Sequence, residues 1–375
     1  MKFAVTLSTY ISRQFAFSFV LVTGVLAMLI MFIDGLELLR KASSRDIPVL
    51  ILLDMVFLKL PMLLQTILPF SILVSAVLAY TSLARRSELV VIRSAGVSVW
   101  EFLMPSVLTA FGIGLVVIFA INPLSSIMLN KYEHLNAKYF ENRQNLLDIS
   151  ETGLWIKQQF YMLPQKAGEK EVPNEMIIHA RSVSGSNNIA MRNIEMIALD
   201  SNDTFLFRID VKEGILTDET WKFNDGTVTF KDNTSSKVPT FFMDTNLKQN
   251  DIQNSFADPQ SISFFQLPVF ISKLEKSGFS ALGHVLQWHK ILSSPFFYSA
   301  MVLIGAIFSL RAPRQGMVGY SITLSIVFGF IIYFLSNLVS SIGLSGSMPI
   351  IVSAWTPVVI SMLIGAGLLL HYEDG

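Results

Sequence analysis

The sequence predicts a membrane α-helical protein with six transmembrane helices and one inserted all-β, jelly-roll-like domain. Hydrophobic residues make up 52% of the 375 positions and charged residues only 15%, whereas a soluble domain carries about 25% charged residues. Six long uncharged segments occur along the chain, and a polar stretch of short alternating runs separates the third from the fourth. We therefore expect the chain to divide into a membrane part and a water-soluble part.

Each uncharged segment is close to the roughly 20 residues that a helix needs to cross a bilayer. The segments are Phe15–Ile33, Leu60–Ala84, Phe102–Ile121, Ile291–Leu310, Gln315–Val339 and Pro349–Leu370. The first is too long for the apolar part of a signal peptide, and no small-residue cleavage site follows it. We therefore expect six retained spans, three on each side of the polar stretch.

Lysine and arginine in the short connecting segments predict the orientation of the spans. Three cationic segments fall on one side of a six-span arrangement: Lys2 with Arg13, then Arg85, Arg86 and Arg93, then Arg311 and Arg314. That side, with both termini, is expected to face the cytoplasm. The opposite side carries four cations that this rule does not explain: Arg40, Lys41, Arg45 and Lys59.

The polar stretch is typical of an all-β domain that follows a helical lead-in. Short runs separated by turn residues indicate an antiparallel sandwich, barrel or jelly roll. The expected strands lie in Gly153–Lys157, Glu175–Ala180, Ile194–Leu199, Thr204–Ile209, Thr220–Phe223 and Thr227–Phe230, with a turn at Asn224–Gly226. The predicted division is 1–125 for the first three spans, 126–280 for the β-domain and 281–375 for the last three spans. Following span three, the β-domain would lie in the periplasm of a Gram-negative cell.

The sequence shows no motif for catalysis or cofactor binding. It has no cysteine, and it lacks the Gly-x-x-x-x-Gly-Lys-Ser/Thr phosphate loop, the Gly-x-Ser-x-Gly elbow and the His-Glu-x-x-His pair. The five histidines are scattered, and the formal net charge of zero argues against nucleic acid as a partner. We expect no catalytic residue, no metal site and no bound cofactor. Energy for any work would come from a partner protein.

The segment between spans two and three predicts a short amphipathic helix near residues 85–101. Its apolar face recurs at helical spacing, at Leu89, Ile92, Gly96 and Val99. Arg86 and Arg93 fall on another face. Glu88 could pair with Arg85, or it could project outward and dock on a soluble protein. The pattern alone leaves docking and an ordinary positive-inside loop about equal.

Two patterns within the spans indicate close packing or lipid contact. Small residues recur every four positions in span two, at Ser71, Ser75 and Ala79. Such a stripe lets another helix approach closely, and packing within this chain explains it adequately. Span five carries a cluster of aromatic residues, Phe328, Phe330, Tyr333 and Phe334. By pattern alone, these aromatic side chains face lipid or pack against neighbouring helices.

The run Arg86-Ser-Glu-Leu-Val-Val-Ile-Arg-Ser-Ala-Gly resembles the permease subunits of the lipopolysaccharide exporter, the LptF/LptG family. Agreeing motifs occur along the whole chain: Tyr10-Ile-x-Arg, Leu68-Pro69, Gly153-Leu-Trp-Ile-Lys, Leu274-Glu-Lys-Ser-Gly and Phe328-Gly-Phe-x-x-Tyr. The span count and the position of the insert also agree. Gly-Leu-Trp and Leu-x-x-Ser-Gly are more similar to the LptG branch than to the LptF branch.

The resemblance implies an inner-membrane half-transporter without catalytic activity of its own. In that family an LptF-type permease pairs with an LptG-type one, and an LptB-type ATPase dimer uses ATP beneath them. Lipopolysaccharide then passes to an LptC-type bridge protein. The implied ATPase-coupling residues are Arg85, Arg86, Ser87, Glu88 and Leu89. The implied lipid-binding residues are Arg40 and Lys41 at lipid phosphates, with Phe328, Phe330, Tyr333 and Phe334 at acyl chains.

Two alternatives stay open on the sequence. The LptF paralogue of the same exporter would share the fold and the mechanism. A membrane-anchored sensor or scaffold with a periplasmic β-domain belongs to another class, but it would rarely need six spans and a docking helix.

Overall fold

The computed structural model describes residues 2–43, 45, 47–140, 154–159, 175–184, 189–200, 204–217, 220–244, 258–276, 280–310 and 318–373. The chain forms two compact units. The helical unit comprises Met1–Tyr132, Pro259–Pro268 and Leu282–Gly375, and the sheet unit comprises Glu133–Asp258 and Val269–Ala281. Arg311 and Arg314, which contribute to the predicted orientation, and Gly153 lie outside the described residues.

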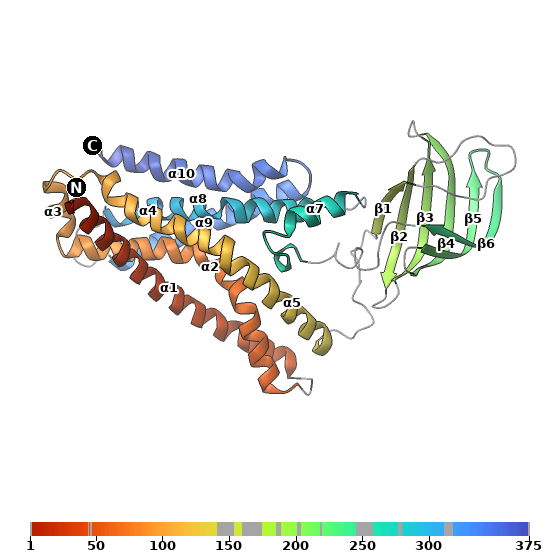
Figure 1. The fold of residues 1–375 in the computed structure, drawn as a ribbon, viewed down its shortest axis with the longest axis horizontal. Helices are drawn as coiled ribbons and strands as arrows, with labels where there is room; N and C mark the ends of the chain where they lie inside the picture. Colours follow the sequence, from red (N-terminus) through yellow and green to blue (C-terminus); the bar gives the residue numbers. More distant parts are fainter. Residues whose placement is uncertain are drawn as a thin grey trace. The chain divides into compact units, whose positions relative to one another are not determined.

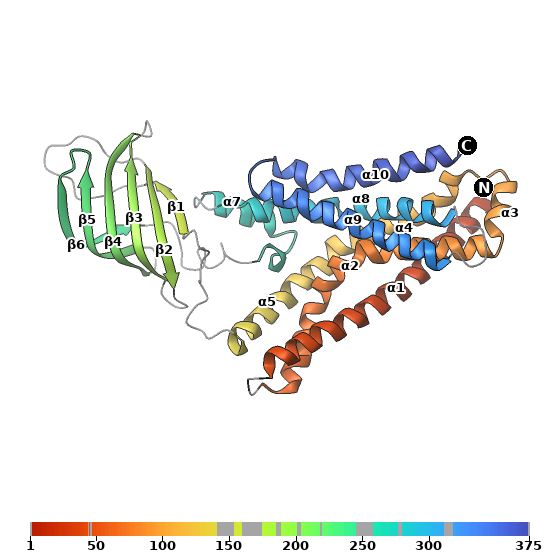
Figure 2. The same cartoon turned by 180° about the vertical axis from the view of Figure 1, so that it is seen from behind.

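Six helices in the described chain are long and apolar enough to cross a membrane, which confirms the predicted spans. They are α1 (Lys2–Ala42), α2 (Val49–Arg85), α4 (Val99–Val116) continuing through the π-helical turn η1 (Val117–Ile121) into α5 (Asn122–Tyr139), α8 (Leu282–Leu310), α9 (Val318–Leu344) and α10 (Ile350–Glu373). Shorter elements are α3 (Glu88–Ser94), the 3₁₀ turn η2 (Pro259–Ser261) and α7 (Leu267–Lys276). Within the helical unit, both termini and α3 lie at the same end (Figures 1 and 2).

The helical unit is built around α8. Within their most apolar stretches, 72% of the residues of α8 are buried, compared with 17% in α9 and 6% in α1. A Cβ added at Gly114 of α4 would lie 2.4 Å from the Cα of Pro295, and one at Gly305 would lie 2.7 Å from the Cβ of Ala76 in α2. Glycine therefore lets α4 and α2 approach α8 closely. The small-residue stripe of α2 is buried at Ser71, Ser75 and Ala79.

Several hydroxyl groups inside the spans donate hydrogen bonds to carbonyls of their own helices. In three spans the carbonyl of a proline accepts a hydrogen bond from a hydroxyl four residues later: Thr109 to Pro105 (2.7 Å), Ser299 to Pro295 (2.9 Å) and Ser361 to Pro357 (2.7 Å). Ser294 donates to the carbonyl of Ile291 at 2.8 Å, which lacks its usual partner because Pro295 has no N–H. These bonds matter because hydrocarbon offers no alternative partner.

The sheet unit contains one six-stranded antiparallel sheet, which confirms an inserted all-β domain. Its strands are β1 (Leu154–Gln159), β2 (Glu175–Ser184), β3 (Ile189–Leu199), β4 (Phe205–Thr217), β5 (Thr220–Phe230) and β6 (Ser235–Asp244). Each strand pairs with the next in the chain, so the described strands form a meander. The crossover connections that define a jelly roll do not occur among these strands.

The turn predicted at Asn224–Gly226 is wrong, because β5 runs through it as a single strand. Asp225 has a φ of 60° and interrupts the ladder locally. The register nevertheless continues on both sides, with Glu213 opposite Asn224 and Val211 opposite Gly226. Pairing with β4 and β6 on both edges therefore outweighs the local preference of Asn-Asp-Gly for a turn.

One face of the sheet is apolar and buried. It carries Met176, Ile178, Met191, Ile194, Met196, Ile209, Val211, Trp221, Phe223, Phe241 and Met243. The rings of Trp221 and Phe223 stack with their centroids 5.9 Å apart, and Phe223 lies 5.1 Å from Phe241. A Cβ at Gly214 would lie 2.6 Å from the ring of Phe223, so only glycine fits beneath that ring. The alternation of buried and exposed positions along β4 and β5 produces this face.

Candidate functional site

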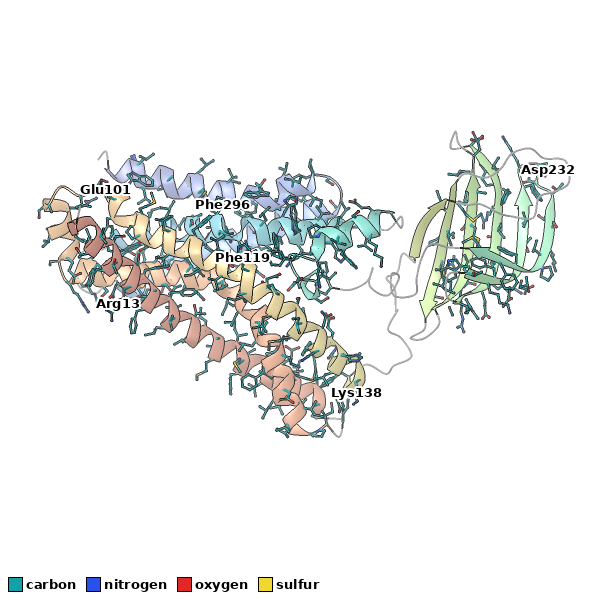
Figure 3. All side chains as sticks on the ribbon, in the orientation of Figure 1. Arg13, Glu101, Phe119, Lys138, Asp232 and Phe296 are labelled. Atoms are coloured by element: carbon teal, nitrogen blue, oxygen red, sulfur yellow. The ribbon has the colours of Figure 1, made fainter. Side chains whose placement is uncertain are left out.

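The segment after α2 forms the short helix α3, as the helical spacing predicts. It begins after Ser87, whose φ of 56° turns the chain sharply out of α2. Leu89 and Ile92 pack against the core of the helical unit. Gly96 instead ends the segment in a left-handed turn with φ 81° and is exposed. Figure 3 shows Arg13 from α1 and Glu101 from α4 at the end of the helical unit that also holds α3.

Glu88 is tied to α1 by a hydrogen bond. The hydroxyl of Tyr10 donates to Oε2 of Glu88 at 2.8 Å, across 78 positions of sequence. Glu88 is partly buried, whereas Arg85, Arg86 and Ser87 are exposed. Of the five predicted coupling residues, three therefore face outward, while Leu89 faces the core and Glu88 links α3 to the first span.

The outward face of α3 is apolar with one nearby cation. Val90 is 68% exposed and Val91 is 65% exposed, and Arg93 follows them on the surface. The surface of this seven-residue helix therefore carries two adjacent apolar side chains next to a cation. The sequence analysis missed these two residues, although the inward spacing of Leu89 and Ile92 leaves them on the opposite face.

The cations at the other end of α1 are in three different situations. Lys59 of α2 forms an ion pair with Asp34 of α1, with Nζ and Oδ1 2.5 Å apart, and its Nζ lies 5.5 Å from the centre of the Tyr132 ring. Lys41 forms an exposed pair with Glu37 at 2.7 Å. Arg40 is exposed. Among the described residues, Arg40 is the predicted lipid-binding cation that has no carboxylate within 4 Å.

The aromatic cluster of α9 is divided between two faces of the helix. Phe328 packs edge-to-face on Phe308 of α8 with centroids 5.6 Å apart, and Tyr333 lies 5.5 Å from Phe70 of α2. Phe330 and Phe334 point outward and are 61% and 57% exposed. The four residues therefore do not form one surface.

An apolar groove of about 450 Å³ lies between α1, α2 and α9. Its lining contains Leu21, Val22, Val25, Leu26, Ile67, Phe70, Val74, Leu78 and Ile326. Because α1 and α9 are the least buried spans beside it, this groove is open to whatever surrounds the helical unit. Among the described residues, no three histidine or acidic side chains gather closely enough to hold a metal ion.

Six apolar spans, a β-domain inserted between the third and fourth, and a short helix between the second and third define a multi-pass membrane protein of the permease type. Residues 9–371 match the family described as "Lipopolysaccharide export system permease LptF/LptG". The chain therefore belongs to the LptF/LptG family of lipopolysaccharide export permeases.

Two curated relatives carry the name "Lipopolysaccharide export system permease protein LptG". They come from Escherichia coli strain K12 and from Escherichia coli O6:H1 strain CFT073. Each is 26% identical to the chain over 378 aligned positions, which cover 97% of this chain and 98% of the relative. The chain is thus similar to LptG along its whole length, including the insert.

Proposed function

We propose that the chain is the LptG-type subunit of a lipopolysaccharide exporter in the inner membrane of a Gram-negative bacterium. The observation that carries this proposal is the similarity to LptG across 98% of that protein's length. The chain would pair with an LptF-type permease. Lipopolysaccharide would leave the membrane through the two permeases toward an LptC-type bridge protein, with the β-domain in the periplasm and both termini in the cytoplasm.

The energy for transport would come from an LptB-type ATPase dimer that docks on α3. ATP would be bound and hydrolysed in that partner. The geometry supports this role because α3 presents Val90, Val91 and Arg93 outward, next to the exposed Arg85 and Arg86, while its other face packs on the helical core. Docking there would also act on α1 through the hydrogen bond between Tyr10 and Glu88. Since residues of α1 line the apolar groove, a displacement of α3 would move one side of that groove.

The lipid would contact the other end of α1 and the apolar surfaces. Arg40, which has no carboxylate within 4 Å among the described residues, could meet a lipid phosphate directly, whereas Lys41 must first leave Glu37. Each such contact contributes about 1 kcal/mol near an anionic surface. Phe330 and Phe334 would meet acyl chains directly, while Phe328 and Tyr333 would support the helix behind them. The apolar face of the sheet would receive acyl chains after they leave the membrane.

Glu88→Ala or Glu88→Lys tests the coupling role most simply. Either change should abolish lipopolysaccharide-stimulated ATP hydrolysis while the protein remains folded and inserted. Normal growth and normal export with these variants would remove Glu88 from the coupling site.

Tyr10→Phe tests the link to α1 without changing any charge. Because it removes a single hydrogen bond to a carboxylate, worth about 1.5 kcal/mol, the ATPase should still bind while transport per ATP falls several-fold. Thr9→Val is the matched control, since the one side-chain bond of Thr9 within the described part of the chain goes to the Val5 carbonyl of its own helix, at 2.9 Å. Equal transport by both variants and the wild type would show that α3 does not act through Tyr10.

A further inference from the structure

A cavity with polar lining, called the polar cavity below, lies within the helical unit and is distinct from the apolar groove. It has a volume of about 270 Å³ and is bordered by α2, η1, α5, η2, α8, α9 and α10. Its lining includes the amides of Gln65, Gln287 and Asn337, the hydroxyls of Ser294 and Ser336, and Lys290. A cavity with so many polar groups among membrane spans is unusual, because each such group is costly in hydrocarbon unless it lines a pathway or a site.

Lys290 is a cation without a matching anion. It is partly buried in α8, and no carboxylate of the described residues lies within 4 Å of its ammonium group. The contrast with Lys59 is direct, since Lys59 lies at a similar membrane end and is neutralised by Asp34. Polar and charged residues inside spans usually pair with one another or mark the path of a charged substrate. Because Lys290 is not paired with a carboxylate of the described residues, its position fits a residue on the path of a charged substrate.

The amides around Lys290 can donate hydrogen bonds to an anion. Within the described chain, no hydrogen bond occupies the side-chain amide of Gln287 or of Asn337. Gln65 accepts a bond from Asn122 through its oxygen and donates one from its amide nitrogen to the carbonyl of Pro61, both at 3.4 Å. One of its two N–H groups therefore remains for an anion. The π-helical turn η1 lies directly before Asn122 and also borders the cavity at Val117. Irregular turns of this kind frequently occur at functional sites. The hydroxyl of Ser294 already donates to the carbonyl of Ile291, so the donors beside the cation are the amides and the hydroxyl of Ser336. A cation next to such donors fits a phosphate group.

The aromatic rings of Tyr333 and Phe70 separate the polar cavity from the apolar groove. A small cavity of about 30 Å³ shares Tyr333 with the polar cavity and Phe70 with the groove. These two rings pack against each other with centroids 5.5 Å apart. Polar and apolar compartments therefore adjoin across one aromatic contact, which is the arrangement that an amphipathic lipid requires for its headgroup and its chains.

The depth of Lys290 also suits a headgroup. It is the ninth residue of α8, which begins at Leu282, so it lies about 12 Å along the helix from that end. Lys290 also directly precedes the uncharged run Ile291–Leu310. Because that run alone is long enough to cross a core about 30 Å thick, the lysine lies at its end and not at the bilayer centre.

We propose that the cavity around Lys290 binds the phosphate of an anionic lipid, with the acyl chains passing Tyr333 and Phe70 into the apolar groove. The site lies within a single chain and uses neither α3 nor the cations of α1. It rests on the proposed function only in that the permease moves a phosphate-bearing lipid, and its test measures binding alone.

The experiment measures binding of short-chain phosphatidylglycerol to the purified full chain in a neutral detergent, by native mass spectrometry. Lys290→Met should weaken binding about 10-fold or more, because it removes a charge-assisted hydrogen bond, whereas Lys290→Arg should stay within about 3-fold of the wild type. Lys237→Met, an exposed lysine of β6, controls for net charge. Diacylglycerol with the same chains should bind all variants equally. Competition with inorganic phosphate distinguishes a site for free phosphate from one that requires the lipid.

Unchanged phosphatidylglycerol binding by Lys290→Met would overturn the proposal, and so would an equal loss of diacylglycerol binding, which would indicate a collapsed cavity. Lys290→Met should also be no less resistant to heat than the wild type, since it removes an unpaired charge. If it does not fold, Gln287→Leu replaces it, with an expected loss of about 3-fold or more. ATPase recruitment is measured in a separate experiment. Loss of the lipid site would therefore not contradict the proposed function, and absence of an ATPase would not contradict the lipid-binding result.

Discussion

Lys59→Met is expected to destabilise the helical unit because it leaves the Asp34 carboxylate buried without the cation that faces it. The side chain of Asp34 is 9% exposed and that of Lys59 is 24% exposed. In the described structure the second carboxylate oxygen of Asp34 already lacks a hydrogen bond. Removing one partner of a fully buried pair costs about 3–5 kcal/mol. Because Lys59 is partly solvated, we expect a loss of about 2–3 kcal/mol here.

A double-mutant cycle isolates the pair. Lys59→Met, Asp34→Asn and the double variant would be unfolded in mixed micelles with increasing dodecyl sulfate, and the free energy of unfolding would be compared. The double variant should recover most of the loss, since it buries no unpaired charge. Glu37→Gln is the control, because it breaks an exposed pair with Lys41 and should cost less than about 1 kcal/mol. Losses that simply add in the double variant would refute the reasoning.

Two further predictions compare neighbouring residues on the same helix. Gly114→Ala should lower the free energy of unfolding by about 1–3 kcal/mol through overpacking against α8, while Gly112→Ala, where a Cβ would meet nothing within 4 Å, should change it little; equal effects in the same unfolding assay would contradict the close contact. Phe328→Ala should cost about 3 kcal/mol because Phe328 packs on the core, whereas the exposed Phe330→Ala should preserve stability and reduce photocrosslinking to lipid. The opposite order of these effects would reverse the assignment of the two faces of α9.

The spans could be predicted from the sequence because one physical requirement fixes them. An uncharged run of about 20 residues has few alternatives to crossing a bilayer, and each predicted run lies within or largely overlaps a helix of the structure. Strands of the insert were predicted from alternation, which is a weaker signal. At Asn224–Gly226 this signal fails. The three residues favour a turn locally, but pairing of β5 with both β4 and β6 keeps them in one strand.

The contacts between side chains cannot be predicted from this sequence, because they depend on how helices distant in the chain pack together. Tyr10 and Glu88 are 78 positions apart, and no periodicity relates them. Asp34 and Lys59 offered a weak signal, since each flanks an uncharged run on the same side of the membrane. The cavity at Lys290 offers none, because its polar groups come from α2, α5, η2, α8 and α9, and only the packing of these distant segments brings them together.

The most direct test of the permease assignment is affinity purification of the tagged full-length protein from its native membrane in mild detergent, followed by mass spectrometry of proteins and lipids. The account predicts recovery of an ABC-type ATPase, of a second six-span permease of the same family and of lipopolysaccharide, with the ATPase lost in Glu88→Lys. Recovery of the folded protein alone, or with a signalling partner and no ATPase, would contradict it.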